Sequence, residues 1–198
     1  MNYRILIAED EPRLRNILCD YFTSRGDIPF PAQNGAEALD LSRLEAGKVR
    51  LASDLFSMLE LTRQIFDKMS LLVKEKELTV HYDIAESFYL YADESRIGQV
   101  ITNFATNAIK YSPQGGNIRL KIFQDQGKHH FSIENESEPL PEEALERIWD
   151  SFYRTETSRT SKGTGLGLPI AKSIIELHRG SCSASNTSTG VEFQFTLP

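Results

Sequence analysis

The stretch from Asp93 to Tyr111 constrains the fold most, because its pattern predicts a long helix with one apolar face. That face has to be buried against another layer, so the helix belongs to a packed domain. Asn103 and Asn107 are four residues apart and project from one side of the helix, and Lys110 lies about one turn further along that side. The stretch therefore predicts a helix that offers two amides and an ammonium group to a ligand.

A glycine-rich segment further along the chain predicts a turn that opens a second helix, expected at 166–178. The segment consists of Gly163, Thr164, Gly165, Leu166, Gly167 and Leu168. Glycines let the backbone approach a phosphate closely, and the first turn of a helix offers unpaired N–H groups. An ordinary glycine-rich turn is the alternative. Together with the first helix, the segment predicts a site for a nucleoside triphosphate and its metal ion.

Two commoner phosphate-binding motifs do not fit this segment. The P-loop fails because Ala171 stands before Lys172 and Ser173, where a glycine is required. The dinucleotide fingerprint fails because Leu168 and Ile170 occupy the places where a third glycine could fall. The sequence therefore indicates a nucleotide site of another kind.

The rest of the chain predicts an α+β fold, a two-layer sandwich in which helices cover one face of a sheet. We expect strands at 4–8, 28–32, 49–51, 78–84, 88–92, 118–123, 130–133, 181–185 and 191–197, and helices at 12–25, 36–45, 54–77, 93–111, 141–152 and 166–178. Asp54 is expected to cap the long helix that ends near Glu77, and strands 78–84 and 88–92 are expected to pair. Residues 155–162 contain no apolar side chain and are expected to form a loop.

Composition excludes several classes of function for these 198 residues. A formal charge of -6 and a pI near 5.3 argue against a nucleic-acid partner, which needs a basic surface. No apolar run approaches the roughly 18 residues of a membrane span, and the N-terminus lacks a signal-peptide pattern. Cys19 and Cys182 are too far apart in sequence to suggest a disulfide framework or a metal site. We therefore expect a cytoplasmic globular protein.

The two motifs resemble those of the ATP-binding domain of sensor histidine kinases, a family related to gyrase, the ninety-kilodalton heat-shock chaperones and MutL. The resemblance covers about residues 41–198 and implies the family's mixed sheet with helices on one face, with ATP and Mg²⁺ as ligands. It implies that Asn107 is the principal magnesium ligand and Asn103 a second one, that Lys110 contacts phosphate, and that Tyr111 lines the nucleotide pocket. These three side chains, Asn103, Asn107 and Lys110, are our candidate catalytic residues. A polar helix face with two incidental asparagines is the alternative.

The residue at position 103 separates two branches of the resemblance. In the gyrase and chaperone branches a glutamate at this position activates water for ATP hydrolysis, whereas this chain has Asn103. An amide cannot act as a general base near neutral pH. The resemblance therefore implies phosphoryl transfer to a protein side chain rather than a hydrolytic cycle.

The resemblance continues through two weaker motifs. In the segment that matches the G1 box, Asn135 replaces the aspartate that accepts a hydrogen bond from adenine, and Ser137 and Pro139 replace two glycines. An asparagine can still accept this bond, but without charge. Phe152 matches the box before the lid over ATP. Candidate phosphate contacts in or beside this lid are Arg154, Arg159 and Lys162, for which solvated surface charge is an equal alternative.

Residues 1–41 resemble something else, the first βαβ part of a response-regulator receiver domain. The third strand of a receiver, with its phosphorylated aspartate, has no match here. We therefore interpret the chain as a fusion of a truncated receiver-like fragment, 1–41, with a kinase-like ATP-binding domain, 42–198. A fragment of this size cannot bury a core alone, so we expect it to dock on the larger domain or to form a homodimer.

A histidine kinase also needs an acceptor histidine on a dimerising helical hairpin. The four histidines of the chain, His81, His129, His130 and His178, lie on or beside predicted strands or at the end of the last helix. We therefore expect the histidine-bearing helices to be supplied in trans, with a response regulator as a further partner. A nucleotide-binding module without turnover and a fusion without kinase activity are the alternatives.

Overall fold

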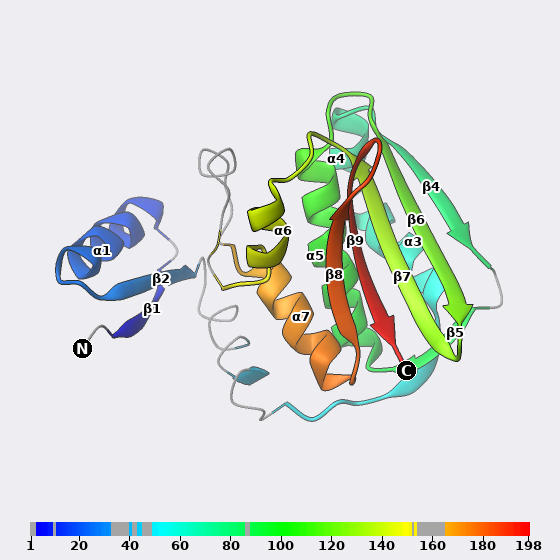
Figure 1. The fold of residues 1–198 in the computed structure, drawn as a ribbon, viewed down its shortest axis with the longest axis horizontal. Helices are drawn as coiled ribbons and strands as arrows, with labels where there is room; N and C mark the ends of the chain where they lie inside the picture. The colour runs from blue at the N-terminus through cyan, green and yellow to red at the C-terminus, as the bar shows by residue number, and fades with distance from the viewer. Residues whose placement is uncertain are drawn as a thin grey trace.

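The computed structural model describes residues 3–9, 11–32, 40, 43–44, 49–85, 88–151, 153 and 165–198. The elements shown in Figure 1 are β1 (Arg4–Ala8), α1 (Pro12–Ser24), β2 (Ile28–Ala32), β3 (Asp54–Ser57), α3 (Met58–Lys68), α4 (Ser70–Glu75), β4 (Thr79–Ile84), β5 (Tyr89–Ala92), α5 (Glu94–Tyr111), β6 (Asn117–Asp125), β7 (Lys128–Glu136), α6 (Glu142–Arg147), α7 (Gly167–Leu177), β8 (Ser181–Asn186) and β9 (Gly190–Leu197). Among the described helices, none combines the length and the apolar character needed to cross a membrane.

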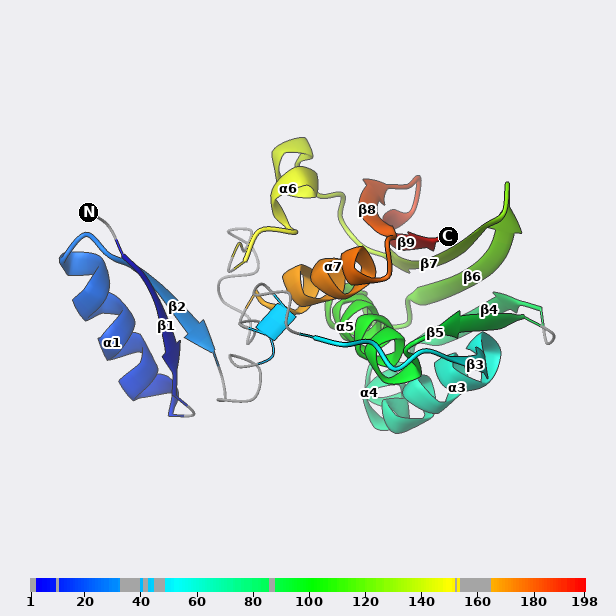
Figure 2. The ribbon, with the colours of Figure 1, turned by 90° about the horizontal axis from the view of Figure 1, so that it is seen from below.

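A mixed five-stranded sheet forms one layer of the larger part of the chain. Its strand order is β4-β6-β7-β9-β8, with β4 and β6 parallel and the other neighbours antiparallel. Helices α3, α5 and α7 lie together on one side of this sheet (Figure 2). The α+β fold with helices on one face of a mixed sheet, as predicted from the sequence, is confirmed.

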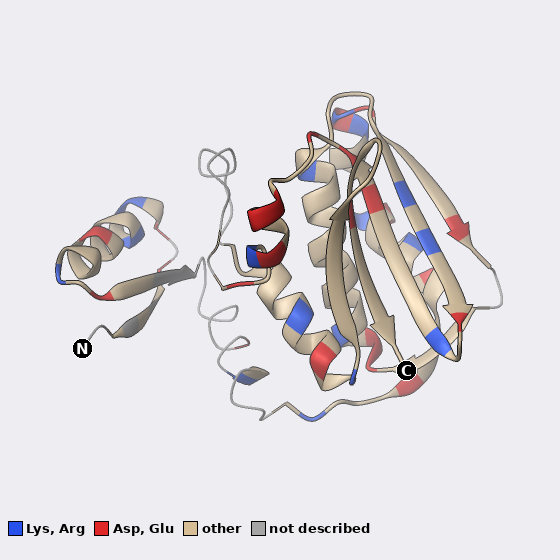
Figure 3. Ribbon diagram, in the orientation of Figure 1, with Lys and Arg blue, Asp and Glu red and all other residues tan. Residues whose placement is uncertain are grey.

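Alternation along the strands places the core between the two layers. In β6, Ile118, Leu120 and Ile122 are buried, while Arg119 and Lys121 between them are not. Charged residues recur along β6 and β7 (Figure 3), in keeping with a second face that no helix covers. The sheet thus supplies one apolar face for the helices and one polar face.

Helix α5 lies at the centre of the helical layer because its apolar stripe is complete. Its buried side chains are Ile97, Val100, Ile101, Phe104, Ala105, Ala108 and Ile109. The Phe104 ring lies 6.2 Å from that of Trp149, 5.7 Å from that of Phe193 and 6.4 Å from that of Phe195, measured between centroids. The helix begins at Asp93, whose carboxylate accepts a hydrogen bond from the N–H of Arg96 at 3.1 Å. The predicted bounds of this helix are confirmed.

Two predictions about the region before α5 are wrong. Residues 49–51 form no strand, and Asp54 does not cap a helix but begins β3; Ser57 caps α3 instead, accepting from the N–H of Glu60 at 3.3 Å. The expected helix 54–77 is divided into α3 and α4 at Met69. Strand β3 takes the place of the first helical turn because Phe56 is buried against the core and pairs with Leu90.

The expected pairing of strands 78–84 and 88–92 is also wrong. The two segments are strands, β4 and β5, but β4 pairs with β6 in parallel and β5 pairs with β3. Local alternation predicts a strand but does not identify its partner. Helix α6 is shorter than predicted and ends at Arg147, and the expected loop 155–162 lies outside the described residues.

The N-terminal elements form a separate small unit. Strands β1 and β2 pair in parallel, and α1 contains no buried residue. Both views show these elements apart from the layers formed by the rest of the chain (Figures 1 and 2). The structure therefore does not show the predicted docking, and the homodimer stays a prediction.

The junction between the two parts contacts the larger domain through residues 40 and 44. One Arg96 nitrogen, Nη1, lies 2.8 Å from each carboxylate oxygen of Asp40, and Gln99 donates to the same carboxylate at 2.8 Å. The Leu44 side chain is 5% exposed and belongs to the core of the larger domain. The chain is therefore fixed to α5 at its entry, although the predicted boundary at 41–42 lies outside the described residues.

Candidate functional site

The two motifs singled out from the sequence meet in the structure. The side-chain amide of Asn103, Nδ2, donates a hydrogen bond of 2.9 Å to the backbone carbonyl of Gly167. A Cβ at position 167 would lie only 3.3 Å from Oδ1 of Asn103, closer than such atoms normally approach. A glycine at this position therefore leaves room for the amide, and the start of α7 lies against the polar face of α5.

The polar side chains of α5 lie at the rim of the packed layer. Asn103, Asn107 and Lys110 are each half-buried, while Tyr111 is 45% exposed. The Lys110 ammonium lies 5.0 Å from the centre of the Tyr111 ring, within the range of a cation–π contact. None of the four side chains is sealed inside the core, so all remain where a ligand on this side of the helix can reach them.

The glycine-rich turn has the backbone geometry that its composition predicts. Gly165 has a φ of 71°, a left-handed conformation that other residues adopt only with strain. The Leu166 side chain is fully buried and Leu168 packs against the core, so the turn is anchored on both sides of Gly167. No described side chain caps helix α7 at its start. Pro169 has no N–H and the N–H of Ile170 donates to the carbonyl of Leu166 at 3.0 Å, so the N–H groups of Gly167 and Leu168 are the ones that the first turn leaves for a ligand. Gly163, Thr164, Phe152, Arg154, Arg159 and Lys162 lie outside the described residues.

The G1-like segment lies at the end of β7, on the other side of the site. Asn135 is 2% exposed, and its Nδ2 donates to the carbonyl of its neighbour Glu136 at 3.2 Å. The N–H of Ser137 donates to the carbonyl of Thr189 at 3.4 Å. A Cβ at Gly190 would collide with the backbone carbonyl of Asn135. The turn between β8 and β9 therefore lies directly against this segment.

An open hollow of about 440 Å³ lies where these elements meet the C-terminal end of α5. It is lined by Tyr111, Pro113, Glu136, Ser137, Glu138 and Thr189. The structure thus brings the predicted residues Tyr111 and Ser137 to one cavity, but Asn103 and Asn107 do not line it. Sequence reasoning missed four lining residues: Pro113, Glu136, Glu138 and Thr189. The first three stand beside residues of the predicted motifs, which could have indicated them, whereas Thr189 belongs to no motif.

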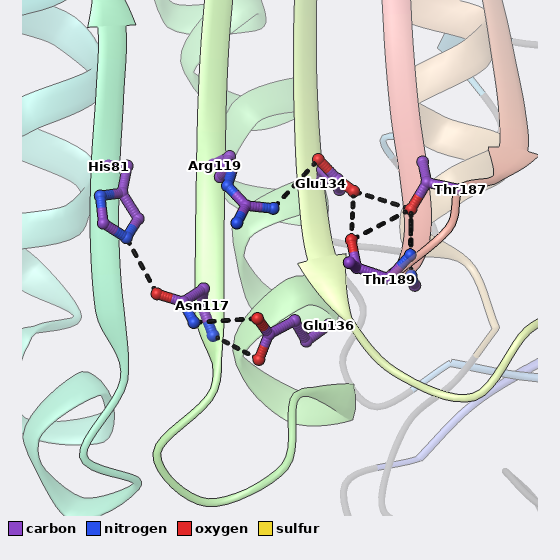
Figure 4. A network of polar contacts seen from close by, with 8 residues as sticks. His81, Asn117, Arg119, Glu134, Glu136, Thr187 and Thr189 are labelled. Atoms are coloured by element: carbon purple, nitrogen blue, oxygen red, sulfur yellow. Dashed lines mark hydrogen bonds and ion pairs between the residues drawn. The ribbon is translucent and has the colours of Figure 1, made fainter.

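A polar network that includes the lining residues Glu136 and Thr189 fixes two walls of the hollow (Figure 4). Glu136 accepts from the backbone N–H of Asn117 at 3.1 Å and from its side-chain amide at 2.9 Å, and Oδ1 of the same asparagine lies 2.9 Å from Nε2 of His81. These contacts connect β4, β6 and β7 at the edge of the hollow. They hold the Glu136 carboxylate in one position.

The second part of the network holds the β8–β9 turn. One carboxylate oxygen of Glu134 accepts from the hydroxyls of Thr187 and Thr189, both at 2.7 Å. Burial by itself raises the pKa of Glu134, but the two hydrogen bonds and the charges of Arg119 and Lys121 outweigh it. The pKa of this carboxyl therefore lies below its ordinary value, and at neutral pH the ionised group fixes the turn that carries Thr189.

The described residues contain no group of three or more His, Cys, Asp or Glu side chains that could hold a metal ion. Magnesium bound to a nucleotide needs few protein ligands, because it keeps most of its waters and takes oxygens from the phosphates. The amide oxygens of Asn103 and Asn107 suit this role, since they add no negative charge beside the phosphates. The donor set therefore fits magnesium carried by a nucleotide.

The family model described as "Histidine kinase-, DNA gyrase B-, and HSP90-like ATPase" matches residues 92–198, more than half of the chain. Sensor histidine kinase WalK of Bacillus subtilis (strain 168) is 34% identical over 147 residues, which are 68% of this chain and 24% of WalK. The chain thus spans about a quarter of the length of this relative.

Solved structures agree with the sequence relatives. The catalytic domain of histidine kinase ThkA, in a nucleotide-free form, is 31% identical with a TM-score of 0.68, over 74% of this chain and 95% of the other. Full-length ShkA in complex with AMPPNP is 27% identical with a TM-score of 0.71, over 82% of this chain and 34% of ShkA. ThkA in complex with the response regulator protein TrrA is 26% identical with a TM-score of 0.68, over 96% of this chain and 53% of the other.

Proposed function

This chain belongs to the family of histidine kinase-, DNA gyrase B- and HSP90-like ATPases, and from that premise we propose that it is the ATP- and magnesium-binding catalytic domain of a sensor histidine kinase. It holds Mg-ATP between the polar face of α5 and the glycine-rich turn before α7. The γ-phosphoryl group passes to a histidine that another polypeptide supplies.

The contact between Asn103 and Gly167 carries this proposal. It joins the amide-bearing helix to the turn that offers free N–H groups, across 64 residues of sequence. Asn103 and Asn107 are both half-buried on the same side of α5, so neither amide is sealed in the core. That ShkA is a structural neighbour in complex with AMPPNP supports a nucleotide as the ligand.

Different residues of the site bind different parts of the Mg-ATP ligand. Asn107 and Asn103 hold magnesium through their amide oxygens, and Lys110 offsets phosphate charge. The first N–H groups of α7 bind phosphate oxygens, and Asn135 accepts a hydrogen bond from the base. Magnesium, when bound, neutralises charge that develops on the phosphates. The protein contributes position and charge, since Asn103 cannot serve as a general base for hydrolysis.

The acceptor histidine comes from a partner. His81, His129 and His130 belong to strands of the sheet, and His178 forms hydrogen bonds at the end of α7, with Nε2 accepting from the N–H of Asp93 at 3.1 Å. None of them is placed on a helical hairpin. We propose histidine-bearing dimerisation helices as the partner and a response regulator as a second one, supported by the complex of ThkA with TrrA.

Calorimetric titration with ATP, with and without Mg²⁺, tests the proposal. Asn107→Ala should abolish the magnesium-dependent part of the affinity, more than about tenfold, because it removes a ligand of the ion. Thr106→Ala is the matched control, since Thr106 is exposed on the same helix and its hydroxyl bonds only the carbonyl of Thr102. Unchanged magnesium dependence in the Asn107 variant would contradict the assignment.

Phosphoryl transfer is tested separately with radiolabelled ATP and a histidine-bearing hairpin domain from a related kinase. Acid-labile label on the hairpin's histidine is the expected result. Binding of Mg-ATP without such label would favour a nucleotide-binding module without turnover. The G1-like segment gives this second function some support, because Asn135, Ser137 and Pro139 all depart from the family's residues.

We also propose that residues 1–41 are a truncated receiver-like fragment that joins two copies of the chain. Its exposed apolar residues support this, since Ile17 is 62% and Tyr21 is 52% exposed. Light scattering after size-exclusion chromatography should show a dimer. A monomer that protease cleaves quickly near Asp40 would contradict it.

A further inference from the structure

The C-terminal end of α5 is capped by a lysine from a different helix. The ammonium of Lys76, just after α4, donates to the backbone carbonyls of Ile109 at 3.0 Å, Lys110 at 2.8 Å and Ser112 at 2.7 Å. An ammonium group has three N–H donors, so these three bonds use all of them. A side chain 33 residues or more away in sequence thus satisfies the end of this helix.

The Lys76 ammonium supplies hydrogen-bond donors to carbonyls that would otherwise have no partner at the end of α5. The last four carbonyls of a helix have no intrahelical partner, and a cation placed there also offsets the helix dipole. At α5 the carbonyl of Ala108 accepts from the N–H of Ser112 at 3.0 Å and from its hydroxyl at 2.7 Å. Lys76 serves the next two carbonyls and that of Ser112 itself. The final turn of α5 therefore depends on one half-buried ammonium group.

The turn that follows α5 is attached to the same place. The N–H of Gly115 donates to the carbonyl of Lys76 at 2.9 Å, and the N–H of Thr79 donates to the carbonyl of Gly116 at 3.0 Å. Tyr111, the last residue of α5, and Pro113, just before these attachments in sequence, both line the hollow. The residues at the end of α4 thus hold in place the segment that forms one wall of the hollow.

We infer that Lys76 is a positioning residue of the nucleotide site, an inference that rests on the proposed function. Its ammonium keeps the last turn of α5 wound, and that turn carries Lys110 and Tyr111. Without it, three carbonyls lose a charged donor at once and the turn unwinds toward water. Lys76 touches no ligand itself; it acts through the two residues that do.

The test compares four variants by calorimetric titration with Mg-ATP, at a temperature where scanning calorimetry shows each variant to be folded. Lys76→Met keeps the length of the side chain and removes its donors, and we expect about tenfold weaker binding. Lys76→Arg restores charge and donors and should recover part of the loss. Lys74→Met removes the same charge from an exposed position of α4 and should bind like the wild type.

Ser112→Ala is the control for stability. It removes the hydroxyl bond to Ala108 at the same helix end and leaves the three contacts of Lys76 in place. It should lower the Tm without weakening nucleotide binding. Hydrogen exchange of residues 108–116 should rise more in Lys76→Met than in Ser112→Ala.

Two results would overturn the inference in different ways. If the wild type does not bind Mg-ATP, the proposed function fails and the inference fails with it. If the wild type binds and Lys76→Met binds equally well, or if Ser112→Ala loses as much affinity, the proposed function stands and Lys76 has only a structural role.

Discussion

Helices α1 and α5 look alike in sequence and differ in the structure. Both have apolar residues at helical spacing, yet α5 buries seven side chains and α1 buries none. The difference is the second layer: α5 packs on a five-stranded sheet, whereas among the described elements α1 packs mainly on the two strands β1 and β2. An amphipathic pattern therefore predicts a helix, but the size of the partner surface decides how much the helix contributes to stability.

Phe104→Ala should have the largest effect in this comparison. Phe104 is fully buried and contacts three aromatic rings, so its removal should lower the free energy of unfolding by about 3–5 kcal/mol. Ile17→Ala on α1 should change it by less than about 0.5 kcal/mol, because the side chain is 62% exposed. Urea unfolding measures both. A comparable loss from Ile17→Ala would show that α1 is covered in solution, as in the proposed dimer.

The N-termini of α5 and α1 differ in their capping hydrogen bonds, and removing the cap should have the second largest effect on stability. The Asp93 carboxylate accepts from the N–H groups of Arg96 and Ala52, whereas Glu11 at the start of α1 makes no capping bond. Asp93→Ala should therefore cost about 1–2 kcal/mol, and Glu11→Ala nothing measurable. Thermal unfolding followed by circular dichroism gives both values. An equal loss of stability in the two variants would contradict the inference that the Asp93 carboxylate stabilises α5 by capping it.

The smallest expected effect on stability comes from the C-termini of α1 and α4, and here one substitution should raise the free energy of unfolding. Helix α1 is followed by Gly26 with a φ of 79°, whereas α4 is followed by Glu77 with a φ of 54°. A left-handed conformation costs a residue with a side chain about 1 kcal/mol, so Glu77→Gly should stabilise the protein by up to that amount. Gly26→Ala should destabilise α1 without affecting the larger domain's Tm. A lower Tm in Glu77→Gly would show that the Glu77 side chain has a role of its own.

The sequence predicted well where local signals and the final environment agree. Helix α5 was predicted within one residue because Asp93 is a strong cap and the apolar stripe is unbroken. The glycine-rich turn was predicted because glycines let a backbone turn tightly and approach a phosphate, and in its described part Gly165 has a left-handed backbone. The first helix after the junction was placed wrongly because Asp54 was predicted as its cap, whereas Ser57, three residues later, is the residue that caps it. Only pairing with β5 decides between them.

Some residues of the candidate site could be named from the sequence, and others could not. Asn103, Asn107 and Lys110 could be named from spacing along one helix, because helical geometry alone puts them on one side. Tyr111 was named from the resemblance to the kinase family. Thr189 could not, because it reaches the hollow through a turn whose place depends on β9 pairing with β7. Nor could Lys76 be recognised, since its partners are backbone carbonyls, which leave no trace in the identity of residues 109, 110 and 112.

By itself the amino-acid sequence determined the helices with complete apolar stripes, most of the strands, and the residue types of the proposed nucleotide site, because each depends on neighbours within a few positions. Only the tertiary structure decided which strands pair, which residues form the walls of the hollow, and that a lysine beyond α4 closes the end of α5. These contacts join residues far apart in sequence, and their energies exist only once both partners have been brought together in the folded chain.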